Sequence, residues 1–178
     1  GAYQALISKY QLADQVSIIK VLPQISASRP LNPNRDVKAL RQAWSQIQNV
    51  HECSLLMAQY QHTKAIAYED LGTKYARQLT NQSIEQLLTL VAAQHHPIIL
   101  FGMSVGAIQS YAGTITKLAT YGPWFNVLDT DFNIHLMPSL LGQVWHIRKP
   151  SKDGIINTLS VLDQEGNEIM VIADQRQR

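Results

Sequence analysis

The sequence predicts an α+β fold, a large antiparallel β-sheet with N-terminal helices packed on it. Apolar residues recur at steps of three and four through much of residues 36–93, which is the period of an amphipathic helix. From Pro97 onward the pattern changes to short segments rich in β-branched and aromatic residues, bounded by Gly, Pro, Asn or Asp, as in antiparallel strands. Because the helical run precedes the strands and does not alternate with them, helices and sheet are expected to segregate.

Length and composition suit one globular domain. The 178 residues are 46% hydrophobic, which is enough to bury a core. The formal net charge is only +2 and the basic residues form no run, so nucleic-acid binding is not expected. Cys53 is the single cysteine, which excludes an internal disulfide and fits a reducing compartment. No apolar run approaches the roughly 20 residues that a membrane helix needs. We therefore expect a cytoplasmic domain with no membrane span.

The domain organisation is marked by a proline-rich segment. A short amphipathic helix is expected near residues 3–12, and a linker follows in which three prolines lie among Ser and Asn residues. We therefore divide the chain into an N-terminal helix with a proline-rich linker, residues 1–35, and a compact domain, residues 36–178. The helix and linker are interpreted as the end of a probable preceding half.

The first helix of the compact domain is expected to begin at Asp36, whose carboxylate can accept hydrogen bonds from the free N–H groups of the first turn. His51 follows four residues after the last position of its apolar stripe and is expected on the same helical face. The stripe consists of Val37, Leu40, Trp44 and Ile47. Further helices are predicted around residues 55–58, 64–71 and 84–93, the last of them capped by Ser83.

The strands of the sheet are predicted from period-two patterns and from turn residues at their ends. A hairpin loop at residues 164–167 supplies Gly166, which can adopt the positive φ that tight turns require. The predicted strands are residues 97–101, 107–111, 114–120, 132–136, 143–148, 155–162 and 168–173.

Two features, the G-x-S-x-G segment and Cys53, could indicate a reactive site, but their sequence context argues against it. Residues 102–106 match G-x-S-x-G, the nucleophile elbow of hydrolases, but that motif requires a helix after the turn, whereas a strand is predicted here. A glycine-rich hairpin turn explains it. Cys53 lies two residues from His51 on a predicted helix and therefore faces elsewhere, so we expect a buried, inert thiol.

Most other histidines and the tryptophans are expected to be structural. His135 alternates with apolar neighbours on a strand and is expected to form a hydrogen bond near the turn at residues 129–131. His95 and His96 lie at a predicted helix–strand corner and are expected to be solvated. Partners at metal-ligand spacing are lacking for His62 and His146. The tryptophans are expected to anchor the core, and they are Trp44, Trp124 and Trp145.

Four short segments carry a more specific pattern. They are Ala43-Trp44 leading to Asn49-Val-His51, Gly122-Pro-Trp-Phe-Asn126, Asn133-Ile-His-Leu136 and Arg148-Lys-Pro-Ser-Lys-Asp-Gly154. Together they resemble the C-terminal half of the HemS/ChuS family, cytoplasmic bacterial proteins that bind haem and, in several members, degrade it. The resemblance runs from about residue 40 to residue 176, and it implies the HemS/ChuS-like half-repeat as the fold.

The resemblance also implies a haem site. His51 stands at the position of the axial iron ligand, and a neutral imidazole is chemically suited to iron. Phe101 stands at the position of an aromatic residue that packs on the porphyrin. The two haem propionates need cations, and the corresponding positions are Lys64, Lys149 and Arg176, all of them basic here.

Several residues depart from the family pattern. A Cys-Ser pair at residues 53–54 replaces the aromatic residues that usually follow the ligand histidine, and Ala173 stands at a tyrosine-like position. Lys64 replaces an arginine, which keeps the charge but loses the bidentate fork. Lys149 and Lys152 can also be explained as members of a solvated loop.

The implied function is the binding of haem (haemin) in bacterial haem-iron utilisation, with imported haem handed on or degraded. Degradation would consume O2 and electrons from an external reductase, with haem as the substrate. The full-length relatives include haem-degrading oxygenases, but this chain is not expected to be active alone, because the family's distal arginine comes from an N-terminal half that we expect to be missing. The alternative is a structural or homodimerising half-domain with little independent haem affinity, which needs the N-terminal half for activity.

Overall fold

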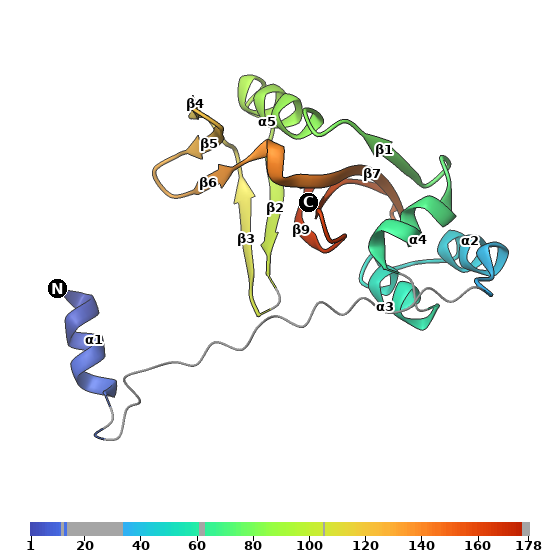
Figure 1. Ribbon diagram of the computed structural model, residues 1–178, viewed down its shortest axis with the longest axis horizontal. Helices are drawn as coiled ribbons and strands as arrows, with labels where there is room; N and C mark the ends of the chain where they lie inside the picture. The colour runs from blue at the N-terminus through green and yellow to red at the C-terminus, as the bar shows by residue number, and fades with distance from the viewer. Residues whose placement is uncertain (12, 14–33, 61–62, 105, 176–178) are drawn as a thin grey trace.

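A six-stranded antiparallel sheet is the centre of the protein (Figure 1). The structure is a computed structural model that describes residues 1–11, 13, 34–60, 63–104 and 106–175. The strand order is β1-β7-β8-β9-β2-β3, and all neighbouring pairs are antiparallel. These elements confirm the predicted α+β class. The six strands are β1 (Ala76–Leu79), β2 (Ile98–Met103), β3 (Ile108–Gly113), β7 (Leu141–Ser151), β8 (Gly154–Asp163) and β9 (Glu168–Asp174).

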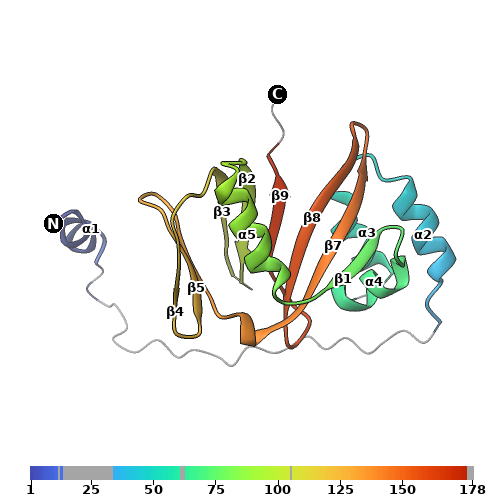
Figure 2. The same ribbon diagram turned by 90° about the horizontal axis from the view of Figure 1, so that it is seen from above.

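Helices cover both sides of this sheet (Figure 2). The helices on one side are α2 (Val37–Ser45), α3 (Glu52–Gln59) and α4 (Lys64–Leu71), and α5 (Ser83–Ala93) lies on the other. Successive side chains of β7 point alternately to the two sides of the sheet. Val144 packs in the core under α5, and Trp145 packs in the core under α2–α4. A small sheet joins the α5 core and consists of β4 (Leu118–Tyr121), β5 (Trp124–Leu128) and β6 (Asn133–Leu136).

The helix predicted at the N-terminus is present as α1 (Ala2–Tyr10), and none of its residues is buried. Residues 14–33 of the predicted linker lie outside the described residues. Among the described residues, no helix is both long and apolar enough to cross a membrane.

The helix α2 forms the centre of its core as predicted. Its N-cap is Asp36, whose carboxylate accepts a hydrogen bond from the Ala39 N–H at 2.9 Å. Leu40 and Trp44 are fully buried. The Trp44 indole N–H donates to the Arg148 carbonyl oxygen at 3.1 Å, which ties α2 to β7.

The predicted position of His51 on the α2 stripe is wrong. The helix ends at Ser45, six residues earlier, and His51 is the exposed N-cap of α3. The helix ends in a tightened turn, in which the N–H groups of Gln46 and Ile47 bond three residues back, and a local turn then follows at Asn49. Its side-chain oxygen accepts the His51 N–H at 3.0 Å and its carbonyl accepts the Glu52 N–H at 2.9 Å. Such local bonds from Asn compete with helix continuation.

Other differences from the predicted elements are also local. The cap of α5 is Gln82 and not Ser83. The strand predicted from residue 114 begins only at Leu118, because the Asp129 carboxylate binds the backbone N–H groups of residues 116–117. The strands β1 and β5 were not predicted. Trp124, expected in the core, is 41% exposed beside the β4–β5 turn.

The hairpin between β8 and β9 is confirmed. Gly166 has a φ of +85°, and the Asp163 N–H donates to the Asn167 carbonyl at 2.9 Å. The Asp163 carboxylate also accepts the N–H groups of residues 165 and 167, which closes the loop.

The backbone at Gly142, beside the bulge in β7, leaves no room for a side chain. A Cβ there would lie 2.0 Å from the Asp163 carbonyl oxygen. We expect Gly142→Ala to lower the free energy of unfolding by about 1–3 kcal/mol, because the strands must shift to relieve the overlap. Urea unfolding followed by circular dichroism measures this. Gly102→Ala is the matched control, since a Cβ there meets nothing within 4 Å. Equal losses in both variants would contradict the steric explanation.

Candidate functional site

One side of the six-stranded sheet, partly covered by α2, α3 and α4, carries the residues of interest. Successive cross-strand partners along it are Trp145, Ser160, Val171, Phe101 and Ser110. Partners across a pleated sheet project to the same side, so these side chains share one face, which we call the helical-cluster face. Trp145 is buried among the helices, whereas Phe101 is only half-buried.

Beyond the helices this face is apolar and partly exposed. Ile99 is paired with Ala173, next to the Phe101 row. Ile108 is paired with Met103 and is 68% exposed on the edge strand β3. We call this surface the open sheet face, and its members are Ile99, Phe101, Met103, Ile108 and Ala173.

A buried carboxylate, Glu168, lies where the helices meet the helical-cluster face. Its side chain is 6% exposed. Its Oε1 accepts hydrogen bonds from the Tyr68 hydroxyl at 3.0 Å and the Ser160 hydroxyl at 2.5 Å, and its Oε2 is paired with the Lys64 ammonium. Tyr68 and Ser160 are themselves buried. Both oxygens are therefore satisfied, as a buried carboxylate requires.

The charges around Glu168 influence one another. Burial alone would raise the pKa of the Glu168 carboxyl, but the Lys64 charge, hydrogen bonds from Lys64 and Ser160, and the Lys149 charge hold that pKa below its usual value. Burial lowers the pKa of the Lys149 ammonium, and the Lys64 charge lowers it further, while Glu168 and Cys53 oppose this. Lys64, Lys149 and Glu168 therefore form one electrostatically coupled cluster with two positive charges and one negative charge.

The start of α3 belongs to the same neighbourhood. Cys53 is 2% exposed, and burial raises the pKa of its thiol to about 11, although the Lys149 and Lys64 charges act in the opposite direction. The predicted buried thiol is thus confirmed. His51 lies two residues earlier, exposed, at the N-cap of α3. No hydrogen bond to its ring is recorded among the described residues.

The structure thus brings together several of the residues predicted from the sequence. Lys64 and Lys149 interact electrostatically with each other and with the α3 start that carries His51. Phe101 lies on the same face of the sheet as Ser160, the partner of Glu168. Arg176 and His62 lie outside the described residues.

Two histidines have partners that were not predicted. A ring nitrogen of His135 is 2.7 Å from the Asn126 side-chain oxygen, so its partner is across the β5–β6 pair and not in the turn at residues 129–131. His96 is exposed, as expected, and its Nε2 also lies 2.7 Å from an Asp174 carboxylate oxygen. The strands β2 and β3 on either side of residue 105 pair as a hairpin, as predicted, and the Ser104 N–H donates to the Ala107 carbonyl.

The sequence-based reasoning missed the polar network of Tyr68, Ser160 and Glu168. The Tyr68 ring is tilted against the Trp145 ring with centroids 5.7 Å apart, and the partners of its hydroxyl lie about 90–100 positions away in the chain, where no local pattern points to them. A signal was present at Ser160, which interrupts an otherwise apolar part of β8 and is fully buried. A buried hydroxyl in a strand usually has a polar partner on the same face.

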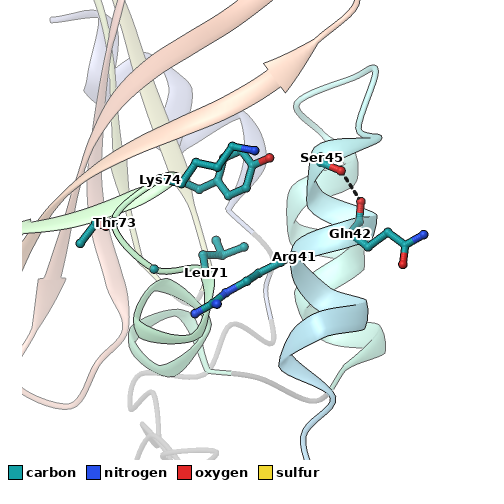
Figure 3. A pocket seen from close by; sticks show the side chains of 8 residues that line it. Arg41, Gln42, Ser45, Leu71, Thr73 and Lys74 are labelled. Atoms are coloured by element: carbon teal, nitrogen blue, oxygen red, sulfur yellow. Dashed lines mark hydrogen bonds between the residues drawn. The ribbon is translucent and has the colours of Figure 1, made fainter.

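A separate hollow of about 500 Å³ lies between α2 and the turn after α4 (Figure 3). Arg41 extends from α2 toward this turn, and its Nε donates to the Asp70 carbonyl at 2.7 Å. Gly72, at φ +72°, ends α4 there. Arg41 is therefore explained as a cation at a helix C-terminus, and the hollow holds none of the predicted site residues.

Comparison with protein families, sequences and solved structures identifies relatives of this chain. The haemin-degrading HemS.ChuX domain family matches residues 61–178. The hemin transport protein HemS of Yersinia enterocolitica is 27% identical over 175 residues, which cover 98% of this chain and 50% of HemS. The structure of holo-PhuS, a heme-binding protein from Pseudomonas aeruginosa, has a TM-score of 0.91 at 27% identity, over 99% of this chain and 51% of PhuS. ChuS, described as an E. coli heme oxygenase, shares the fold with a TM-score of 0.80 at 21% identity, over 99% of this chain and 52% of ChuS. The chain thus spans about half the length of these relatives.

The ionised Glu168 carboxylate is expected to stabilise the fold in a pH-dependent way. An acid whose native pKa lies below its usual 4.5 contributes stability that is present above that value and is lost as the pH falls through the lower native pKa. We therefore expect Glu168→Gln to lower the free energy of unfolding by about 1–3 kcal/mol at pH 7 and by less below about pH 4. Urea unfolding across this pH range measures the difference. A penalty that stays constant with pH would argue against an ionised Glu168.

Proposed function

Because this chain belongs to the haemin-degrading HemS.ChuX domain family, we propose that it binds haemin on the helical-cluster face, as a cytoplasmic step in haem-iron utilisation. The observation that carries this proposal is the juxtaposition, on one face, of an apolar surface with a Lys64–Lys149 pair and the start of α3. Haemin is itself an apolar plane with carboxylates along one edge. The activities of the full-length relatives come to this chain only as proposals, since it spans half their length.

The residues present fit such a ligand. Phe101 and its neighbours on the open sheet face offer apolar area to a porphyrin, and Lys149 and Lys64 supply positive charge near its propionate edge. One buried hydroxyl, Thr158 Oγ1, has no partner among the described residues, and its strand partner is Ala173 of the open sheet face. An unpaired buried polar atom supports a binding surface here, because such atoms normally find a partner.

The proposed roles follow from this fit. His51 supplies an imidazole to the iron, and its place at an exposed N-cap leaves the ring accessible. The Lys64–Lys149 pair lies toward the propionate edge of the ring, and Phe101 packs on the ring. Arg176 is expected to join them. Haem, when bound, supplies the iron at which O2 chemistry occurs.

Two outcomes are open to the bound haem, and they differ in what they require. Handing haem on requires only reversible binding. Degradation requires electrons from an external reductase and control of the iron face opposite His51. The residues on this side of the sheet bind and orient, and none is assigned to the chemical step. We therefore propose haem binding as the activity of this chain and treat turnover as a property of a larger assembly.

A second candidate is a structural or homodimerising half-domain. The exposed Ile108 on the edge strand β3 favours it, because an apolar residue on an open edge invites pairing with another chain. Sedimentation velocity with and without haemin separates the two candidates. A stable dimer without haemin affinity would favour the structural function, and a monomer that binds haemin would favour the first.

A Soret titration with haemin tests the proposed function. We expect saturable one-to-one binding, weakened by about tenfold or more in His51→Ala because the iron loses its protein ligand. His146→Ala is the matched control. The His146 Nε2 is hydrogen-bonded to the Asn157 side-chain oxygen at 2.9 Å on the α5 side of the sheet. Loss of this imidazole is expected to leave the affinity for haemin unchanged. Equal affinity in wild type and His51→Ala would exclude His51 as the ligand, and the absence of binding would exclude the function.

A further inference from the structure

The contacts of Glu168 limit how many ligand carboxylates the two lysines can bind. This inference rests on the proposed function. We propose that the Lys64–Lys149 end of the site receives one carboxylate of its ligand, at Lys149, because Glu168 already occupies Lys64. Glu168 is then a positioning residue that determines how many carboxylates this end of the site recognises.

Glu168 is held so firmly that an arriving ligand does not displace it. Its Oε1 accepts hydrogen bonds from Tyr68 on α4 and from Ser160 on the central strand β8. Tyr68 is 1% exposed and packs on Trp145. The two hydroxyls lie 3.2 Å apart, so one could donate to the other, but moving the carboxylate away would still leave one buried hydroxyl without an acceptor, which is costly. Glu168 therefore stays in place and keeps Lys64 as its partner.

The count of charges follows from this arrangement. Lys64 and Lys149 carry two positive charges and Glu168 one negative charge, which leaves one unbalanced positive charge in the cluster. Lys64 makes an ion pair with Glu168. Lys149 has no ion pair within 4.0 Å among the described residues, so it is the ammonium available to a ligand. Haemin carries two propionates, and only one of them finds a full positive charge here.

Electrostatics support the same assignment. The pKa of the Glu168 carboxyl is held below its usual value by Lys64, hydrogen bonds and Lys149 despite burial, so the carboxylate is charged at neutral pH. Burial lowers the pKa of the Lys149 ammonium. A carboxylate bound beside Lys149 would stabilise this partly desolvated charge, since opposite charges at short range favour the ionised form.

The consequence is a preference that can be measured with porphyrin esters. A ligand with one free carboxylate is expected to bind as tightly as one with two, whereas a ligand with none binds more weakly. The two propionates of haemin lie side by side on one edge, and the ring can be turned over. A monomethyl ester can therefore present its free acid to Lys149 whichever propionate is esterified.

The experiment compares haemin with its monomethyl and dimethyl esters by Soret titration. Arg176→Gln is present in every protein, because Arg176 lies outside the described residues and could bind a second propionate. We expect haemin and the monoester to bind within about twofold of each other and the diester about fivefold or more weakly. In Glu168→Gln, which frees Lys64, haemin is expected to bind about fivefold more tightly than the monoester.

Two further variants separate this inference from other effects. Glu69→Gln removes a negative charge from the exposed side of α4 and is expected to leave the ratio of haemin to monoester affinity unchanged. Lys64→Gln combined with Glu168→Gln restores the charge count and is expected to return the ratio to about one. Each variant is first checked for a cooperative thermal transition.

The outcomes distinguish the inference from the function on which it rests. Haemin binding about fivefold more tightly than the monoester when Glu168 is intact would overturn the inference while haem binding stands. A ratio that does not change in Glu168→Gln would overturn it as well. If none of the three porphyrins produces a saturable Soret change, the proposed function fails, and the inference fails with it.

Discussion

The strand β7 must be buried on both of its faces, and the rest of the structure depends on this constraint. Val144 needs α5 and the small sheet on one side, while Trp145 and Ile147 need α2 and α4 on the other. Its neighbours β1 and β8 satisfy its backbone along both edges. The bond from Trp44 to the Arg148 carbonyl fixes the helical cluster against it. Because β7 also carries Lys149, the position of the candidate site is set by the same packing.

The sequence predicted those parts of the fold that depend on local patterns. Helical and strand periods, the Asp36 cap and the hairpin at Gly166 are properties of neighbouring residues, and they agree with the structure. Predictions failed where one side chain redirected the backbone. A turn at Asn49 follows the end of α2 and places His51 at the start of the next helix, whereas apolar spacing alone would have continued α2 to His51. Asp129 bound backbone N–H groups and shortened a strand in the same manner.

The candidate site was predictable only in part, for a different reason. His51, Lys64, Lys149 and Phe101 came from a resemblance of sequence patterns. The network that surrounds them did not, because its members are far apart in the chain. Lys64 and Glu168, for example, are separated by 104 positions. No period or motif joins such residues, and only strand register and helix packing bring a carboxylate beside two ammonium groups.

The buried thiol of Cys53 has a consequence for the durability of the protein. Oxidation of cysteine by peroxides proceeds through the thiolate, and a thiol with a pKa of about 11 holds almost none of it at neutral pH. Burial also keeps oxidants away from the sulfur. The single cysteine of the chain therefore lies close to the proposed iron position without becoming a target for sulfenic acid formation. The one thiol of the chain therefore stays reduced.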